Sequence, residues 1–299
     1  GKNAAAGDYF TAMEFGKALE EYGWKVSFLS QNGAKDWYEV ENDVDILISL
    51  LEYYDPRKIK STNKFLVKIA WPRNWFNKWV SYPWFKNYDI ILASSKTACQ
   101  YIKEKTGIET FLLPIATNSN RFNETNCLKE EYQCDYCFTG SYWDHPRDII
   151  EMLNPESIEY TFKVYGKNWE KVEKFKDYYQ GFIEYAKLPY LYASTKIVID
   201  DANIATKKYG SVNSRVFDAL ASGALVITNG ELGAKETFNG LLPYYHSKKE
   251  LHDQINYYLT NEEVRMAKVK ELQKIILQNH TYTQRAKSLK NVLKTYSGL

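Results

Sequence analysis

The chain has 299 residues, of which 39 are basic and 37 acidic, so its formal net charge is +2. This balance argues against a dedicated nucleic-acid binder, which carries a strong basic excess on one face. Hydrophobic residues make up 44% of the sequence, yet no apolar run approaches the roughly 20 residues that a membrane-spanning helix needs. We therefore expect a globular protein with two domains.

Short apolar runs alternate with amphipathic stretches along the first third of the chain, which is typical of a parallel α/β sheet. Apolar side chains recur at helical spacing over residues 9–22 and predict the first helix. A second helix is expected at 96–105, and strands are expected at 26–29, 45–51, 65–70, 90–94 and 110–113. A doubly wound domain normally opens with a strand, so either that strand lies upstream or Ala4–Ala6 is a remnant of the loop that follows it. The chain could then be a segment of a larger, multidomain protein.

A polar, turn-rich run at 114–129 is interpreted as a linker to a second set of α/β units. Strands are expected there at 136–139, 160–165, 197–199 and 225–228, and helices at 146–153, 188–193, 213–221 and from 248 onward. The pattern predicts two facing Rossmann-like domains with a helical C-terminal tail. The expected boundaries are 1–118 for the first domain, 130–280 for the second, and 281–299 for a final helix that packs back on the first domain.

The chain has four cysteines, two of which form a C-x-x-C at Cys134 and Cys137. This spacing is a metal or redox hint, and His145 nearby makes a zinc site the alternative. Because the pair lies in a predicted strand, we favour reduced structural thiols. Free thiols indicate a reducing cytoplasm.

The segment 196–230 contains the residues that most strongly indicate a ligand-binding function. Its helix, expected from 213, has an apolar face and a polar face that we expect to be open to a cavity or solvent. The polar face bears Ser211, Ser214, Arg215, Asp218 and Ser222. A helix N-terminus attracts anions, and a guanidinium matches phosphate oxygens in a bidentate way. Asp218, one turn further on, could accept hydrogen bonds from ribose hydroxyls. The alternative is an ordinary surface helix whose polar residues pair with each other.

The run from Gly210 to Asn229 resembles the donor-site segment of GT-B glycosyltransferases, and is most similar to the CgeB-like group with its N-x-R-x-F-E/D-A-x-A-x-G pattern. In the related retaining class, the pattern E-x(7)-E provides two acids. Asp218 matches the second acid, but Gly210 stands where the first would be, which puts retaining stereochemistry in doubt.

Four more segments resemble the same family and occur in the family's order. They are Gly7–Tyr9, Tyr136–Tyr142, Tyr165–Trp169, and Gly181 with Tyr185–Tyr192. The resemblance implies a GT-B fold over nearly the whole chain. The last of these segments would read the nucleotide base.

The expected donor-binding residues gather at the ends of strands and at the start of the helix. They are Thr139, Gly140, Ser141, Arg147, Lys167, Tyr185, Ser211, Asn213, Ser214, Arg215 and Asp218. Gly140 would let the backbone approach a phosphate, and Arg147 or Lys167 could neutralise the leaving diphosphate. A simple turn and unremarkable surface cations are the alternatives.

On the acceptor side, Asp8 could be a general base that deprotonates an acceptor hydroxyl, or it could cap the helix at 9–22. The Trp-rich segment 71–85 supplies Arg73, Trp75 and Trp79 as acceptor-side residues. Aromatic faces stack on sugar rings, but contact with a membrane surface and core packing are the other interpretations.

A metal site is not expected. Asp43 and Asp45 form a D-x-D that precedes its strand, and Asp200 and Asp201 end theirs, but the resemblance implies a metal-independent enzyme. No cofactor is expected besides a nucleotide-diphosphate sugar as co-substrate.

The sequence thus predicts a hexosyl- or deoxyhexosyltransferase that modifies a glycan, lipid-linked or protein-linked acceptor in surface polysaccharide or glycoprotein biosynthesis. It would act in the cytoplasm, either free or at the inner face of the membrane. The donor sugar, the base and the stereochemical outcome stay open. The alternatives are a nucleotide-sugar 2-epimerase and a non-catalytic domain that binds a glycan or nucleotide.

Overall fold

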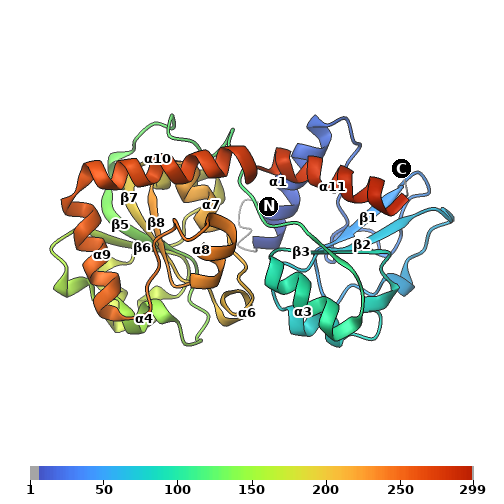
Figure 1. Ribbon diagram of the computed structural model, residues 1–299, viewed down its shortest axis with the longest axis horizontal. Helices are drawn as coiled ribbons and strands as arrows, with labels where there is room; N and C mark the ends of the chain where they lie inside the picture. Colours follow the sequence, from blue (N-terminus) through green and yellow to red (C-terminus); the bar gives the residue numbers. More distant parts are fainter. Residues whose placement is uncertain (1–6, 298–299) are drawn as a thin grey trace. The chain divides into compact units, whose positions relative to one another are not determined.

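The structure, a computed structural model, describes residues 7–297. The described chain divides into two compact units, one formed by 7–115 and 282–297 and the other by 116–281. Figure 1 shows that each unit contains its own sheet with helices around it. Ala4–Ala6, considered above as a remnant of the loop after a first strand, lie outside the described residues.

The unit 7–115/282–297 is built on a four-stranded parallel sheet with the order β1-β2-β3-β4. The strands are β1 (Ile46–Ser49), β2 (Val67–Ala70), β3 (Ile90–Ala93) and β4 (Thr110–Leu112). The helices are α1 (Gly7–Glu21), α2 (Phe76–Ser81), α3 (Lys96–Thr106) and α11 (Tyr282–Ser297). All four residues of β3 are buried, as expected for a parallel strand covered on both faces.

One helix of this unit is held by its own caps and another by a contact between distant parts of the chain. The Ser95 side chain caps α3 by accepting from the Ala98 amide at 3.0 Å, and Gly107 ends the helix in the left-handed region. α11 packs against α1, where the rings of Phe15 and Tyr282 lie 6.3 Å apart. The last helix of the chain therefore belongs to the same unit as the first.

The prediction of a strand at 26–29 is wrong. These residues form no ladder with any described strand, and the side chains of Phe28 and Leu29 are 55% and 42% exposed. Among the described strands, β1 pairs with β2 alone. An apolar run forms a strand only where a neighbouring strand satisfies its backbone, so the pattern alone was insufficient. Phe28 instead lies against Gly16 of α1.

The unit 116–281 contains a parallel sheet with the order β6-β5-β7-β8. Its strands are β5 (Cys134–Thr139), β6 (Phe162–Tyr165), β7 (Thr195–Asp200) and β8 (Leu225–Thr228). Its helices are α4 (Asp148–Met152), α5 (Leu188–Ala193), α6 (Ile204–Lys207), α7 (Ser214–Ala221), α8 (Glu231–Phe238), α9 (Lys248–Thr260) and α10 (Glu262–Asn279). Both central strands, β5 and β7, are almost entirely buried.

The segment 116–129 has no regular structure, as expected, but it is not a free linker. Thr117 and Phe122 are fully buried in the unit 116–281, and the Thr117 amide donates to the His280 carbonyl at 3.0 Å. Polar composition predicted the turns here but could not reveal this packing.

Candidate functional site

The carboxyl ends of β5 and β7 meet at one edge of their sheet, because these two parallel strands are neighbours. β5 ends at Thr139 and leads into Gly140, while β7 ends at Asp200 and leads into Asp201. Helix α7 begins beside both, at Ser214. Open α/β sheets bind ligands at this edge, and most of the expected donor-binding residues lie here.

Arg215 is the centre of this cluster. Its Nε donates to the Thr139 carbonyl at 2.6 Å, and its Nη1 donates to Asp200 Oδ1 at 2.7 Å. Its guanidinium carbon also lies 4.6 Å from the centre of the Phe138 ring. Nη2 donates to no described residue and points past Gly140, where an added Cβ would approach it to 2.8 Å. Arg215 is therefore rigidly held with one nitrogen left available.

Asp200 fixes the start of α7 to the end of β7. Its carboxylate is 2% exposed and accepts from Arg215, from Asn213 Nδ2 at 2.7 Å and from Thr228 Oγ1 at 2.6 Å. Asn213 also caps α7, since its Oδ1 accepts from the Arg215 amide at 3.1 Å. Removing one partner of a buried ion pair typically costs about 3–5 kcal/mol, because the other charge is left uncompensated.

A second buried ion pair lies next to the first. Arg147 Nε donates to Asp201 Oδ2 at 2.8 Å, and its other nitrogens donate to the Ser141 and Asp201 carbonyls. Burial raises the pKa of the Asp201 carboxyl, although the Arg147 guanidinium acts in the opposite direction. Arg147 and Arg215 lie over the Phe138 ring at 5.1 and 4.6 Å. Because all its nitrogens are engaged, Arg147 anchors the loop after β5.

Two glycines allow the loops after β5 and β6 to touch. Gly166 has φ +142°, and a Cβ added there would lie 2.1 Å from the Gly140 carbonyl oxygen. That oxygen accepts from the indole of Trp169 at 2.6 Å, and the Gly140 amide donates to the Tyr165 carbonyl. Only glycine at 166 permits this approach.

The other expected donor residues surround the cluster. Thr139 Oγ1 shares a 2.7 Å hydrogen bond with the Tyr192 hydroxyl, and Ser141 Oγ accepts from the Lys167 amide. The Lys167 ammonium lies 5.1 Å from the Phe182 ring. Tyr185 begins a 3-10 turn and packs edge-on against Phe122.

The polar face expected on α7 is largely covered, which corrects its interpretation as open to a cavity or solvent. Asp218 is 4% exposed, and its Oδ1 accepts from Thr117 Oγ1 at 2.6 Å. Ser211 is 4% exposed and Ser222 2%, and the Ser222 hydroxyl is buried with no partner. Of the five polar residues, only Ser214 and Arg215 stay partly exposed.

Gly210, which stands where the retaining class has its first acid, has φ +70°. A Cβ added there would lie 3.3 Å from the carboxylate of Glu236, which comes from α8. The Glu236 carboxylate therefore lies near position 210. Because Glu236 belongs to α8, the spacing of residues along α7 could not have predicted it.

In the other unit, Asp8 and Arg73 form an ion pair. Arg73 Nη1 lies 2.8 Å from Asp8 Oδ1, and Arg73 is 3% exposed, while the Asp8 side chain is 41% exposed. Arg73 also donates to the Leu50 and Trp71 carbonyls, which follow β1 and β2. Helix α1 begins at Gly7, so Asp8 lies in its first turn and the interpretation of Asp8 as an N-cap is wrong. Arg73 is a buried support for Asp8.

The Trp-rich segment mainly forms core. Trp79 is 1% exposed in α2, so its interpretation as an acceptor-side residue is wrong. Trp71 is fully buried and its indole donates to the Leu113 carbonyl. Trp75 is 39% exposed, with the Lys78 ammonium 4.1 Å from its ring. Of the three residues predicted for the acceptor side, Trp75 is the aromatic one whose ring reaches solvent.

Among residues 7–297, no group of three or more His, Cys, Asp or Glu side chains is placed to hold a metal ion. Asp43 instead pairs with Lys25 at the surface. Cys134 and Cys137 are free thiols buried in β5. A hydrogen bond between the two sulfurs lowers the pKa of Cys134, while burial raises that of Cys137. No helix in the described part of the chain has the length and apolar character needed to cross a membrane.

Sequence reasoning found Arg215, Asn213 and the glycine loop but missed what holds them. It considered Asp200 and Asp201 only as metal ligands, and it did not consider Asn229. Asn229 Nδ2 donates to Asp148 and Asp201, and its Oδ1 accepts from the Ala202 amide. The position of Asn229 just after a buried strand, in the same place as Asp201 after β7, was the available signal.

The model of the glycosyl transferase-like family matches residues 129–291, more than half of the chain. Comparison of the sequence with curated proteins gave no match.

Solved structures resemble the fold at low sequence identity. AviGT4, a glycosyltransferase involved in avilamycin A biosynthesis, has a TM-score of 0.65 and 13% identity, with 98% of this chain and 91% of AviGT4 covered. Sucrose-phosphate synthase from Thermosynechococcus elongatus has a TM-score of 0.62 and 11% identity, with 85% and 74% covered. The T4 phage protein BGT, solved with UDP-glucose, has a TM-score of 0.57 and 15% identity, with 97% and 94% covered.

Proposed function

The chain belongs to the glycosyl transferase-like family and has the GT-B fold, and we propose that it transfers a hexose or deoxyhexose from a nucleotide-diphosphate donor to a glycan acceptor. The acceptor would be a free, lipid-linked or protein-linked glycan of a surface polysaccharide or glycoprotein. Glycosyl transfer follows from the family, whereas the donor, the acceptor and the pathway are the proposal.

The arrangement of Arg215 is the observation that carries this proposal. Two of its nitrogens are bound by Thr139 and Asp200, so the third, Nη2, is held at Gly140 beside the N-terminus of α7. A diphosphate placed there would meet a fixed guanidinium, the half-buried Ser214 and the partial positive charge of the helix. Positive groups at this place stabilise the leaving diphosphate as negative charge develops on it.

In the proposed reaction an acceptor hydroxyl oxygen forms a bond to the anomeric carbon of the sugar. The bond from that carbon to the diphosphate oxygen breaks, and the electron pair leaves with the nucleoside diphosphate. We assign Asp8 as the base that takes the hydroxyl proton, because its half-exposed carboxylate is held in place by the buried Arg73.

We also propose that transfer needs neither a metal nor a cofactor. The two carboxylates that end β7 are the best-placed candidates for a metal, but Asp200 and Asp201 already pair with Arg215 and Arg147. A cation would have to displace both guanidinium groups. The four free thiols support a cytoplasmic location, and the exposed Trp75 is the residue through which a membrane face could be contacted.

The test is a thermal-shift panel of UDP, GDP, dTDP, CMP and ADP on wild type, Arg215→Lys and Arg57→Lys. Lysine keeps the charge of Arg215 but cannot bond Thr139, Asp200 and a phosphate together. Arg57 pairs with the buried Asp55 in the other unit and serves as the matched control.

A nucleotide at about 100 times its Kd should add roughly 2.7 kcal/mol to the free energy of unfolding. This corresponds to a rise of roughly 5–10 °C in the melting temperature. We expect one nucleoside diphosphate to raise the melting temperature of wild type and of Arg57→Lys but not that of Arg215→Lys. No shift in wild type, or a full shift in Arg215→Lys, would contradict the proposed donor site.

A further inference from the structure

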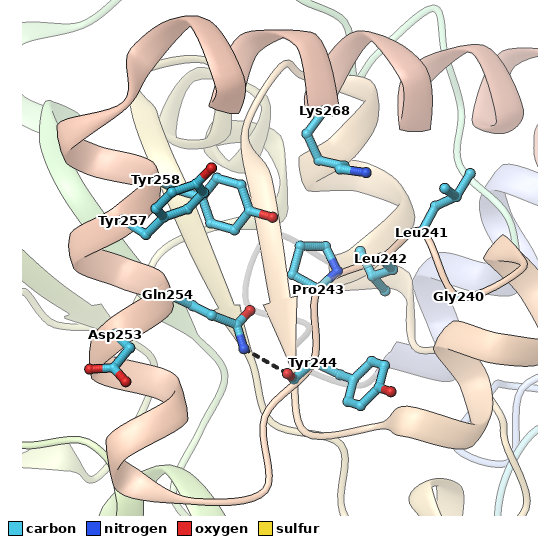
Figure 2. Close-up of a pocket in the computed structure, with 10 residues that line it drawn as sticks. All are labelled: Gly240, Leu241, Leu242, Pro243, Tyr244, Asp253, Gln254, Tyr257, Tyr258 and Lys268. Atoms are coloured by element: carbon cyan, nitrogen blue, oxygen red, sulfur yellow. Dashed lines mark hydrogen bonds between the residues drawn. The ribbon is translucent and has the colours of Figure 1, made fainter.

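A hollow lies in the unit 116–281, between α9, α10 and the loop that follows α8. Its volume is about 680 Å³, and it is lined by Leu241, Pro243, Tyr244, Gln254, Tyr257 and Lys268, among others (Figure 2). This volume is in the range of small-molecule sites. None of its lining residues belongs to the cluster around Arg215.

Aromatic rings provide much of the wall. Tyr257 lines the hollow and is 51% exposed. Its ring centre lies 5.2 Å from that of Tyr258, with 73° between the planes. Tyr258 is less exposed than Tyr257, and its burial raises the pKa of its hydroxyl. The two rings offer an apolar face and a hydroxyl donor side by side.

The polar groups around the hollow are held in place. Gln254 Nε2 donates to the Tyr244 carbonyl at 2.7 Å, which fixes the amide and leaves its oxygen as an acceptor (Figure 2). The Arg265 guanidinium, itself 4% exposed, donates to the Tyr258 carbonyl and fixes the end of α9. These bonds exist without any ligand, so the hollow is formed in advance.

The charges at the hollow are already neutralised. Asp253 pairs with Lys249 at 2.5 Å, and Lys268 pairs with Glu271 at 3.1 Å. An anionic or a cationic ligand would therefore have to compete with an existing ion-pair partner for Lys268 or Asp253. Flat apolar faces combined with fixed donors and acceptors suit a ligand with one apolar face and many hydroxyls.

We propose that this hollow binds a neutral oligosaccharide, stacked on Tyr257 and hydrogen-bonded by Gln254 and Tyr258. Such a site goes beyond sugar transfer, because it needs neither donor nor turnover. Its consequence for a transferase is that a long glycan chain can be retained at a distance from the residues that act on the donor.

The experiment is saturation-transfer NMR and calorimetric titration of the full chain with maltotriose, cellotriose and chitotriose, and with trigalacturonic acid as the anionic comparison. Tyr257→Ala removes the exposed ring. Tyr296→Ala removes a 48% exposed tyrosine of α11 and is the matched control. Folding of each variant is checked by its melting temperature, and its donor site by the nucleotide thermal shift.

We expect a neutral trisaccharide to bind wild type and Tyr296→Ala equally, and Tyr257→Ala to bind about tenfold more weakly. The nucleotide shift should be the same in all three proteins. Binding of none of the neutral trisaccharides, unchanged affinity in Tyr257→Ala, or preferred binding of trigalacturonic acid would each overturn the proposal. A lost nucleotide response would count against the donor site alone.

Discussion

Replacing Gly166 with alanine tests how the donor loop is built. The new Cβ would lie 2.1 Å from the Gly140 oxygen and 3.0 Å from the Ser141 nitrogen, both backbone atoms, and φ is +142°. Backbone strain costs about 1–3 kcal/mol, and overpacking costs about as much again. The 2.6 Å bond from Trp169 to Gly140 would also be disturbed. We expect a total loss of roughly 2–5 kcal/mol.

Gly181→Ala is the matched control for this change. Gly181 also has a positive φ, +85°, and its carbonyl accepts from the Gly166 amide, but a Cβ there meets nothing within 4 Å. Differential scanning calorimetry should show the transition of the unit 116–281 lowered by roughly 5–15 °C in Gly166→Ala and by roughly 2–4 °C in Gly181→Ala. Nucleotide affinity should fall only in Gly166→Ala. Equal melting temperatures for the two variants would refute the steric reasoning.

Three further predictions concern other parts of the molecule. Burial lowers the pKa of His252 below its ordinary value of 6.5, and its Nε2 accepts from the Asn154 amide at 3.1 Å. The unfolded chain therefore binds the proton first, and the free energy of unfolding should fall as pH drops below about 6.5. His252→Leu should flatten this slope in urea titrations, and an unchanged slope would disprove the role of His252. Asp8→Asn should lower kcat by roughly 10²–10⁴-fold with unchanged nucleotide binding, whereas a kcat within twofold of wild type would remove Asp8 as the base. Trp79→Ala should cost about 3–5 kcal/mol in denaturant unfolding, and Trp75→Ala less than about 1 kcal/mol, because only Trp79 is buried. Similar losses would show that burial does not distinguish the two.

The sequence predicted all eight described strands within about two residues at each end, because buried parallel strands are short, apolar and separated by turn residues. It failed at 26–29, where the apolar residues pair with no described strand. It also missed α2, α6 and α8. The first two are short, at six and four residues, and α8 has no side-chain cap at Gly230. Local signals are weakest for such helices.

Some residues of the candidate site could be predicted, because their position along the chain itself indicates ligand binding. Arg215, Asn213 and Gly140 stand at the start of a helix or the end of a strand, where ligand-binding residues are expected. The partners of Arg215 were not predictable, because Thr139 and Asp200 come from separate strands and only the order β5-β7 brings them together. Burial of Trp79 and Asp218 was equally hidden, since a helical wheel shows which residues share a face but not what covers it.

Release of nucleoside diphosphate from nucleotide sugars tests the central claim most directly. Wild type and Arg215→Lys would be incubated with UDP-, GDP- and dTDP-sugars and a glycan acceptor mixture. The released nucleoside diphosphate would be measured over time. The account predicts release from one nucleotide class by wild type, and a rate at least about 10²-fold lower in Arg215→Lys. Release at the same rate by both proteins, or from no nucleotide sugar by wild type, would contradict it.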